Sequence, residues 1–208
     1  MKPVLLTISI VVFYCNPGFT VKDDARILKH IQVISQAGDA RYAEQLLESA
    51  LLKNPNSSDL KEYQVAFKDR KQKALQSIKE IQGKIDLAHY PMANFKYFYQ
   101  LGYLWYLVGD DVKAVNFFEK SLALKSTNSL AECSKGLAQE RLGMRKEALA
   151  SLTRARNLDP ADPLANFHLA LFYIRNSNAS KALKISEIFK EKWPQYFKTI
   201  NDVLKVPQ

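Results

Sequence analysis

Apolar residues along most of the chain recur three or four positions apart, which is the spacing of one face of an α-helix. In residues 75–88, for example, Leu75, Ile78, Ile81 and Ile85 follow one another with mostly polar residues between them. Glycine and proline occur only 7 and 8 times in 208 residues, so long stretches contain no turn signal. The pattern therefore predicts an all-α protein.

Small residues and turn residues recur with a period of 34 positions. The recurrences at this spacing or at twice it are Ala114, Ala148 and Ala182; Gly102 and Gly136; Gly109 and Gly143; Leu101 and Leu169; Pro160 and Pro194. Five recurrences in one phase indicate an internal repeat, and this period is typical of stacked helix pairs. We therefore place a solenoid over residues 21–208, with units at residues 24–57, 58–94, 95–128, 129–162 and 163–196.

The unit at residues 58–94 is degenerate. Gly38 precedes Gly109 by 71 positions, which is two periods plus three, so a small insertion falls between them. The only glycine in this unit, Gly83, is out of phase with the turn in the middle of the other repeats. Without a glycine at that turn, its two helices can merge into one longer helix.

The recurring residues have steric roles within the predicted helix pairs. Gly102 and Ala114 are small, so the paired helices can approach closely, and Phe118 fills the space between neighbouring helices. Gly109, followed by Asp110, ends the first helix in a left-handed conformation, after which the chain turns. Because no single unit can bury its apolar face alone, the units must stack.

An amphipathic segment follows the last unit. Its apolar residues at helical spacing are Tyr196, Phe197, Ile200, Val203 and Leu204, with Lys198, Asn201 and Asp202 between them. A helix here would cover the last repeat with its apolar side and turn its polar side to water. We predict a capping helix at residues 197–206.

The repeat resembles that of the tetratricopeptide (TPR) family over residues 24–196. The family pattern has a Leu-Gly pair, an aromatic residue, an Ala, a large apolar residue and a closing Pro. The unit at 95–128 matches it with Leu101, Gly102, Trp105, Ala114 and Phe118. The resemblance implies a right-handed superhelical solenoid of about five helix pairs, with a concave groove that binds a peptide or helix. It also implies a non-enzymatic adaptor or assembly factor.

Eight groove-lining residues are implied by the same resemblance. They are Tyr99, Tyr103, Tyr106, Leu137, Arg141, Phe167, Leu171 and Arg175. A groove of this composition would suit an amphipathic helix or an extended apolar peptide, with the arginines meeting acidic groups at its edge. Two alternatives stay open, because a segment of this chain could fill the groove, or these side chains could pack between repeats.

The N-terminus has the pattern of a secretory signal peptide. Lys2 precedes an apolar stretch at residues 4–13, which is too short to span a bilayer. We predict a signal peptide at residues 1–20, and hence a periplasmic or secreted protein. A buried or interfacial helix and a lipoprotein modified at Cys15 are the alternatives. After cleavage Cys133 would be the remaining cysteine, without an intrachain disulfide partner.

Basic residues outnumber acidic ones, which gives the chain a net charge of +9. Loss of residues 1–20 removes one lysine and no acid, which leaves +8. This charge is spread over the chain and favours acidic partners or anionic surfaces. The alternative function is therefore a protein that docks on an anionic membrane, glycolipid or wall polymer; nucleic acid is a poor candidate for an exported protein.

The sequence contains no pattern of catalytic residues. His30, His89 and His168 lie in different units without metal-ligand spacing, and phosphate-binding loops and nucleophile elbows are missing. We expect no cofactor and no metal, and a buried, unreactive Cys133. Self-association remains a further possibility, because terminal helices of such stacks can pair with another copy.

Overall fold

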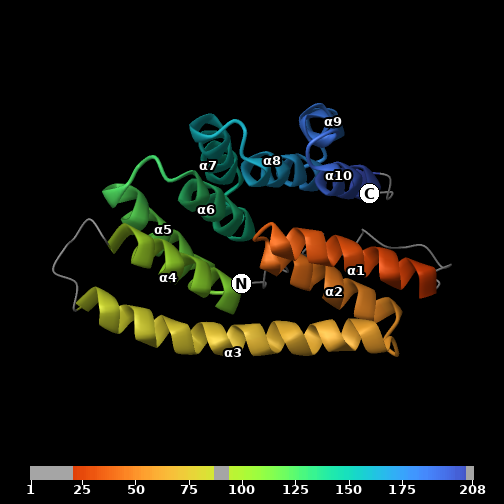
Figure 1. Ribbon diagram of the computed structural model, residues 1–208, viewed down its shortest axis with the longest axis horizontal. Coiled ribbons are helices and arrows are strands. Elements are labelled where there is room, and N and C mark those ends of the chain that lie inside the picture. Colours follow the sequence, from red (N-terminus) through yellow and green to blue (C-terminus); the bar gives the residue numbers. More distant parts are fainter. Residues whose placement is uncertain (1–20, 87–93, 205–208) are drawn as a thin grey trace, which may run out of the picture.

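The structure is a computed structural model that describes residues 21–86 and 94–204. These residues form helices joined by turns, and no strand occurs among them (Figure 1). The helices are α1 (Val21–Gln36), α2 (Ala40–Lys53), α3 (Ser58–Asp86), α4 (Asn94–Val108), α5 (Asp111–Leu124), α6 (Ser129–Arg141), α7 (Arg145–Leu158), α8 (Pro163–Arg175), α9 (Ala179–Ser186), η3 (Glu187–Phe189) and α10 (Pro194–Leu204). The predicted all-α class is confirmed.

Consecutive helices pack as pairs, except at the degenerate unit. Within the described ranges the pairs are α1 with α2, α4 with α5, α6 with α7, and α8 with α9. Between the first and second pairs, α3 runs as one helix of 29 residues. Gly83 lies inside this helix, with open space around it. The two expected helices of the degenerate unit are therefore merged over residues 58–86, which leaves four pairs in this part of the chain instead of about five.

The turns within the pairs repeat the same backbone geometry. Gly109 and Gly143 have φ angles of 103° and 77°, and Ser177, one period later, has a φ of 56°. Left-handed φ is favourable for glycine, which lacks a Cβ, and it ends a helix. Asp110 then caps α5 by accepting a hydrogen bond from the Lys113 backbone N–H at 3.0 Å.

Small residues allow close approach within the pairs, as the repeat predicted. A Cβ placed on Gly102 would lie 2.6 Å from the ring of Phe118. In the next pair, a Cβ on Gly136 would lie 2.8 Å from Cγ of Leu152. Both Phe118 and Leu152 are fully buried, so a glycine and a large apolar residue interlock in each pair.

The stack curves until its two ends meet. In Figure 1, α3 runs along one side, while the later pairs curve round opposite it and bring α10 toward α1. The helices α1 and α10 are in contact. Arg26 and His30 of α1 each have a side-chain nitrogen 3.2 Å from an Asp202 carboxylate oxygen. The solenoid is therefore a closed ring.

The last helix, α10, packs on the last repeat, which it was expected to cap. It also packs on α1. In α10, Ile200 and Val203 are buried, and the helix packs on α8 and α9 as well as on α1.

Among the described residues, no helix is both long enough and apolar enough to cross a membrane. The predicted signal peptide at residues 1–20 and the alternative lipidation residue Cys15 lie outside the described residues.

Candidate functional site

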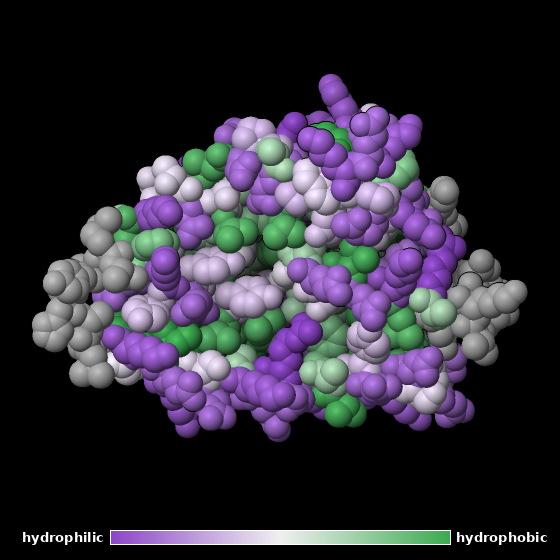
Figure 2. All heavy atoms as spheres, in the orientation of Figure 1, coloured by the Kyte–Doolittle hydropathy of each residue, from purple (hydrophilic) through white to green (hydrophobic). Residues whose placement is uncertain are grey.

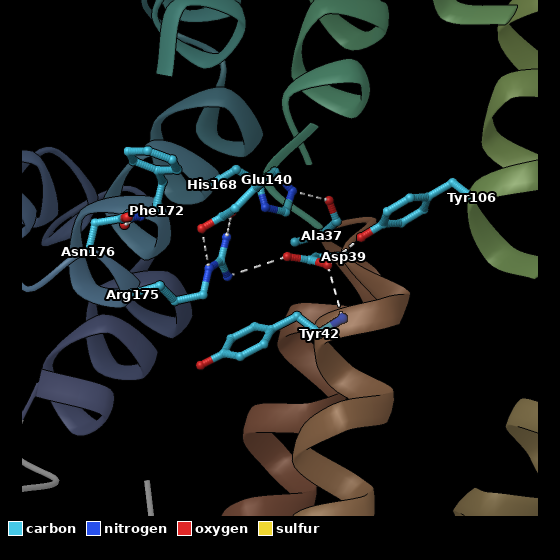
Figure 3. Close-up of polar contacts among 9 residues, drawn as sticks. All are labelled: Ala37, Asp39, Tyr42, Tyr106, Glu140, His168, Phe172, Arg175 and Asn176. Carbon is cyan, nitrogen blue, oxygen red and sulfur yellow. Dashed lines mark hydrogen bonds and ion pairs between the residues drawn. The ribbon is translucent and has the colours of Figure 1, made fainter. Parts of the chain in front are cut away.

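The inner side of the ring is the predicted groove, and part of it is already filled. Helices α4 and α8 turn side chains toward the short segment that joins α1 to α2 (Figure 3). In the space-filling view, polar side chains cover the rim, and apolar or weakly polar ones gather around a hollow near the centre (Figure 2). The segment that joins α1 to α2 therefore occupies one part of the groove, and another part is open.

The structure buries four of the eight predicted groove residues. The exposed fractions are 1% for Tyr106, 5% for Leu137, and 0% for Phe167 and Leu171. These four cannot contact a guest in this conformation, which corrects the expectation that they line an open groove. The other four, Tyr99, Tyr103, Arg141 and Arg175, are partly exposed.

The buried residues pack between repeats or against the last helix. The ring of Phe167 lies 4.7 Å from that of Tyr196 and meets Phe189 edge to face. Leu137 belongs to the same apolar cluster as Tyr106 and Phe118. Packing between repeats was one of the two alternatives left open by the sequence, and it applies to these residues.

The other alternative also applies, because the turn at residues 37–39 occupies the inner groove. Asp39 caps α2 by accepting the Tyr42 N–H at 3.1 Å. The same carboxylate oxygen accepts the hydroxyl of Tyr106 from α4 at 2.5 Å. Burial raises the pKa of Tyr106 well above its usual value, and the adjacent Asp39 carboxylate adds to this, so the phenol keeps its proton and donates.

Helix α8 holds the turn from the opposite side. His168 Nε2 lies 2.7 Å from the Ala37 backbone oxygen. A carbonyl only accepts, so Nε2 carries the hydrogen. Burial lowers the pKa of His168, which favours the neutral imidazole.

In the occupied part of the groove, the guanidinium of Arg175 contacts several residues at once. It donates two hydrogen bonds to the Glu140 carboxylate, from Nε at 2.9 Å and from Nη2 at 2.5 Å. Its Nη1 lies 3.5 Å from Oδ2 of Asp39, and its guanidinium lies 4.6 Å from the centre of the Tyr42 ring. One guanidinium thus joins three repeat units, as Figure 3 shows.

Tyr99 and Tyr103 of α4 make up the open part of the predicted groove. Burial raises the pKa of both phenols, so both are neutral donors at pH 7. Arg70 of α3 lies near enough to Tyr103 to oppose that rise, and it donates to Oγ of Ser35 at 2.8 Å. Arg141 pairs with Asp111, with Nε 3.1 Å from Oδ2 of the carboxylate. The open part is therefore a tyrosine strip with one exposed arginine beside it.

Sequence reasoning missed the roles of Asp39 and His168. An Asp after a turn glycine is expected to cap the next helix, as Asp110 does, and this local role is all that such a pattern indicates. The contact of Asp39 with Tyr106 spans 67 residues, and that of His168 with Ala37 spans 131. No spacing along the chain indicates contacts of that range.

No metal-binding constellation accompanies this network. Among the residues that the structure describes, no three His, Cys, Asp or Glu side chains gather in a way that could hold an ion. Cys133 is buried, and burial raises its thiol pKa far above the usual range. The network can position and neutralise charges, and it contains no activated nucleophile.

Similarity to known proteins is found in the three-dimensional structure. No protein-family model and no curated protein matches the sequence. Among solved structures, TTC0263, a TPR protein of Thermus thermophilus, is similar with a TM-score of 0.58 and 16% identity; the match covers 87% of this chain and 98% of that one.

A second solved structure, YrrB, is described as a TPR protein with an unusual peptide-binding site. It is similar with a TM-score of 0.53 and 17% identity, and the match covers 83% of this chain and 87% of that one. Both likenesses extend over most of the helical ring, and both proteins are built from tetratricopeptide repeats. The chain described here has the tetratricopeptide repeat fold.

Proposed function

We propose that this protein is an exported adaptor or assembly factor that binds a segment of another protein on the open tyrosine strip. The observation that supports this most directly is that Tyr99 and Tyr103 stay partly exposed on the inner side of a TPR fold, while four other predicted groove residues, Tyr106, Leu137, Phe167 and Leu171, are buried. Two partly exposed aromatic rings inside a ring of helices form an amphipathic surface that no described part of this chain covers fully.

The chemistry of this strip suits an amphipathic or apolar segment with an acidic residue. Tyrosine rings provide large contact areas, and they lose little conformational entropy on binding. The neutral phenol of Tyr103 can donate to a backbone carbonyl of a guest, whereas that of Tyr99 already has Ser134 as a side-chain hydrogen-bond partner. Arg70 stands exposed at the edge, where it can meet a carboxylate. The peptide-binding site ascribed to YrrB supports the same use of the fold.

Export is proposed from the sequence, through the signal-peptide pattern at residues 1–20. Mass spectrometry of the mature N-terminus tests it. A first residue near position 20 supports export, and an intact Met1 or Lys2 in the natural host contradicts it.

Site-specific photocrosslinking tests the binding surface. A photoreactive phenylalanine analogue replaces Tyr103 in one variant and Val112 in a control; Val112 is 66% exposed on α5, away from the strip. We expect one partner to crosslink at position 103 and at position 99, but not at 112. Equal crosslinking at 112, or none at either strip position, would overturn the proposal.

The anionic-surface alternative has its own structural support at α9, η3 and the start of α10. Lys181, Lys184, Lys190, Lys192 and Lys198 are exposed there, and Leu183 and Ile188 are solvent-exposed between them. Binding through such a surface weakens steeply with salt, whereas binding through tyrosines does not. Co-sedimentation with anionic vesicles that vanishes at high salt, together with no crosslinking at Tyr103, would favour this function.

A further inference from the structure

A cleft lies between α1 and α10, at the seam where the ring of helices closes. Its volume is about 910 Å³, which is large enough for a small organic molecule. Each helix lines the cleft with one face, through residues at a first position and one, four, five and eight positions after it. They are Ala25, Arg26, Lys29, His30 and Val33 of α1, and Pro194, Gln195, Lys198, Thr199 and Asp202 of α10. This seam cleft shares no residue with the tyrosine strip.

The residues that line the seam cleft carry an excess of positive charge. Arg26 and Lys29 on α1 and Lys198 on α10 are exposed cations, and Asp202 is the one carboxylate among the lining residues. Burial lowers the pKa of His30, so its imidazole is neutral at pH 7. Three cations and one carboxylate give the lining a net charge of +2. Closure of the ring therefore brings like charges together, and an anion between them would offset their repulsion.

The one carboxylate of the cleft is already shared between two partners on α1. Asp202 has Oδ1 3.2 Å from Nη2 of Arg26, and Oδ2 3.2 Å from Nε2 of His30. Within the described ranges, no carboxylate pairs with Lys29 or Lys198, so both ammonium groups can meet a ligand.

The floor of the cleft is polar as well as its rim. His30 and Thr199 line the cleft and are buried, with exposed fractions of 6% and 2%. The Thr199 hydroxyl donates to the Gln195 backbone oxygen at 2.9 Å, whereas Nδ1 of His30 has no hydrogen-bond partner in the described part of the chain. A buried polar atom without a partner is costly, and such atoms are often found at functional sites.

We propose that the seam cleft binds a small phosphate ester with an apolar body. A phosphate ester carries a charge of about −1.5 to −2 at pH 7 and has three acceptor oxygens, which match a net charge of +2 and cations from two helices. A carboxylate would neutralise only half of that charge. Ala25, Val33 and Pro194 provide apolar contacts for the rest of the molecule.

Binding in the seam cleft holds α1 against α10 and strengthens the closed ring, because the ligand contacts cations on both helices. This inference goes beyond the adaptor function and does not depend on it. A free phosphate ester and the head group of a phospholipid share the chemistry that the cleft recognises, and the experiments below distinguish these two sources.

Isothermal titration calorimetry with hexyl phosphate tests the site. The protein is tested as wild type, Lys29→Gln and Lys198→Gln, at constant ionic strength. Lys79→Gln removes one exposed positive charge from α3, away from the cleft, and is the matched control. Each cleft variant should bind at least about fivefold more weakly than wild type, and the control should bind like wild type, because loss of a charged donor acts only at close range. No binding by wild type, or an equal loss in Lys79→Gln, would overturn the proposal.

Hexanoate tests whether the cleft prefers a phosphate. It has a similar apolar body and a single negative charge, so wild type should bind it at least about fivefold more weakly than hexyl phosphate. Equal affinity for the two compounds would contradict a phosphate site.

Hydrogen exchange with and without hexyl phosphate shows where the ligand acts. Amides of α1 and α10 should exchange more slowly with the ligand bound, and those of α5 should change less, because local opening of the seam is suppressed. Equal slowing in all three helices would contradict a site at the seam.

Flotation with phosphatidylcholine vesicles that contain phosphatidic acid distinguishes the two sources. If the natural ligand is a lipid head group, wild type and Lys184→Gln of α9 should float, and Lys29→Gln should not. If wild type does not float but binds hexyl phosphate, the ligand is a free ester. Flotation that is lost in Lys184→Gln and kept in Lys29→Gln would contradict a lipid in the cleft and favour the spread lysine surface. Crosslinking at Tyr103 reports on the adaptor function separately.

Discussion

Two helical glycines provide a matched test of how closely the helix pairs nest. Gly136 lies in α6 against the second helix of its pair, and Gly83 lies in α3 facing solvent. An alanine Cβ at position 136 would lie 2.8 Å from Cγ of Leu152 and 3.2 Å from the backbone oxygen of Ala148. At position 83 the same Cβ has no neighbour within 4 Å. The two substitutions therefore differ in packing alone.

The expected stability changes have opposite signs. In a helix interior, Gly→Ala stabilises by about 1 kcal/mol, because alanine restricts the unfolded chain more than glycine does. Gly83 lies in the last turn of α3, so Gly83→Ala should show most of this gain. Overfilling a tight contact costs about 1–3 kcal/mol. This cost outweighs the gain, and Gly136→Ala should lose about 1 kcal/mol overall. The two variants should thus differ by about 2 kcal/mol, and Gly136→Leu should be less stable still.

Urea unfolding followed by circular dichroism measures the difference from the transition midpoints. Thermal unfolding should separate the two alanine variants by about 4–8 °C for a chain of this size. The folded spectra of both variants should match wild type before unfolding. Stabilisation of Gly136→Ala to the same extent as Gly83→Ala would show that α6 and α7 do not nest at this point, and the register of the repeat would be wrong.

Three further outcomes follow from single residues. Ser177→Gly should stabilise the protein by about 0.5–1 kcal/mol in urea unfolding, because Ser177 has the left-handed backbone that glycine adopts more readily. Burial lowers the pKa of His30 and His168 below 6.5 in the folded state, so the unfolded chain takes up protons first. Stability should therefore fall as the pH drops below about 6.5, and a variant with Gln at both positions should show a flatter dependence in urea titrations at several pH values. Cys133 should react with a thiol reagent only after urea unfolding, as read by peptide mass spectrometry, because its thiol is buried.

Local features of the fold could be predicted because they depend on residues close together in sequence. Gly109 and Gly143 end helices through their own backbone conformation, and Gly102 is close to Phe118 because a helix pair is a short hairpin. The merged helix α3 follows in the same way from the missing turn glycine. Residue type and a 34-residue period were therefore sufficient for the all-α class and for the pairing of helices.

The candidate site was predicted only in part, for a physical reason. The repeat predicts which side of α4 faces inward, and in the structure Tyr99 and Tyr103 of this helix are partly exposed while Tyr106 is buried. Whether an inward residue stays open depends on the angles between successive pairs, which add up along the whole stack. Small changes in each angle decide whether the first repeat meets the last, and no short pattern encodes their sum.

The closure of the ring was decided by tertiary structure alone. His30 meets Asp202 across 172 residues, and Asp39 meets Arg175 across three repeat units. These contacts turned a predicted open groove into one that holds its own turn, and they buried Phe167 against the last helix. The sequence by itself determined the repeating helix pairs, because their packing is local. The tertiary structure decided which part of the groove is free, because that depends on the path of the entire chain.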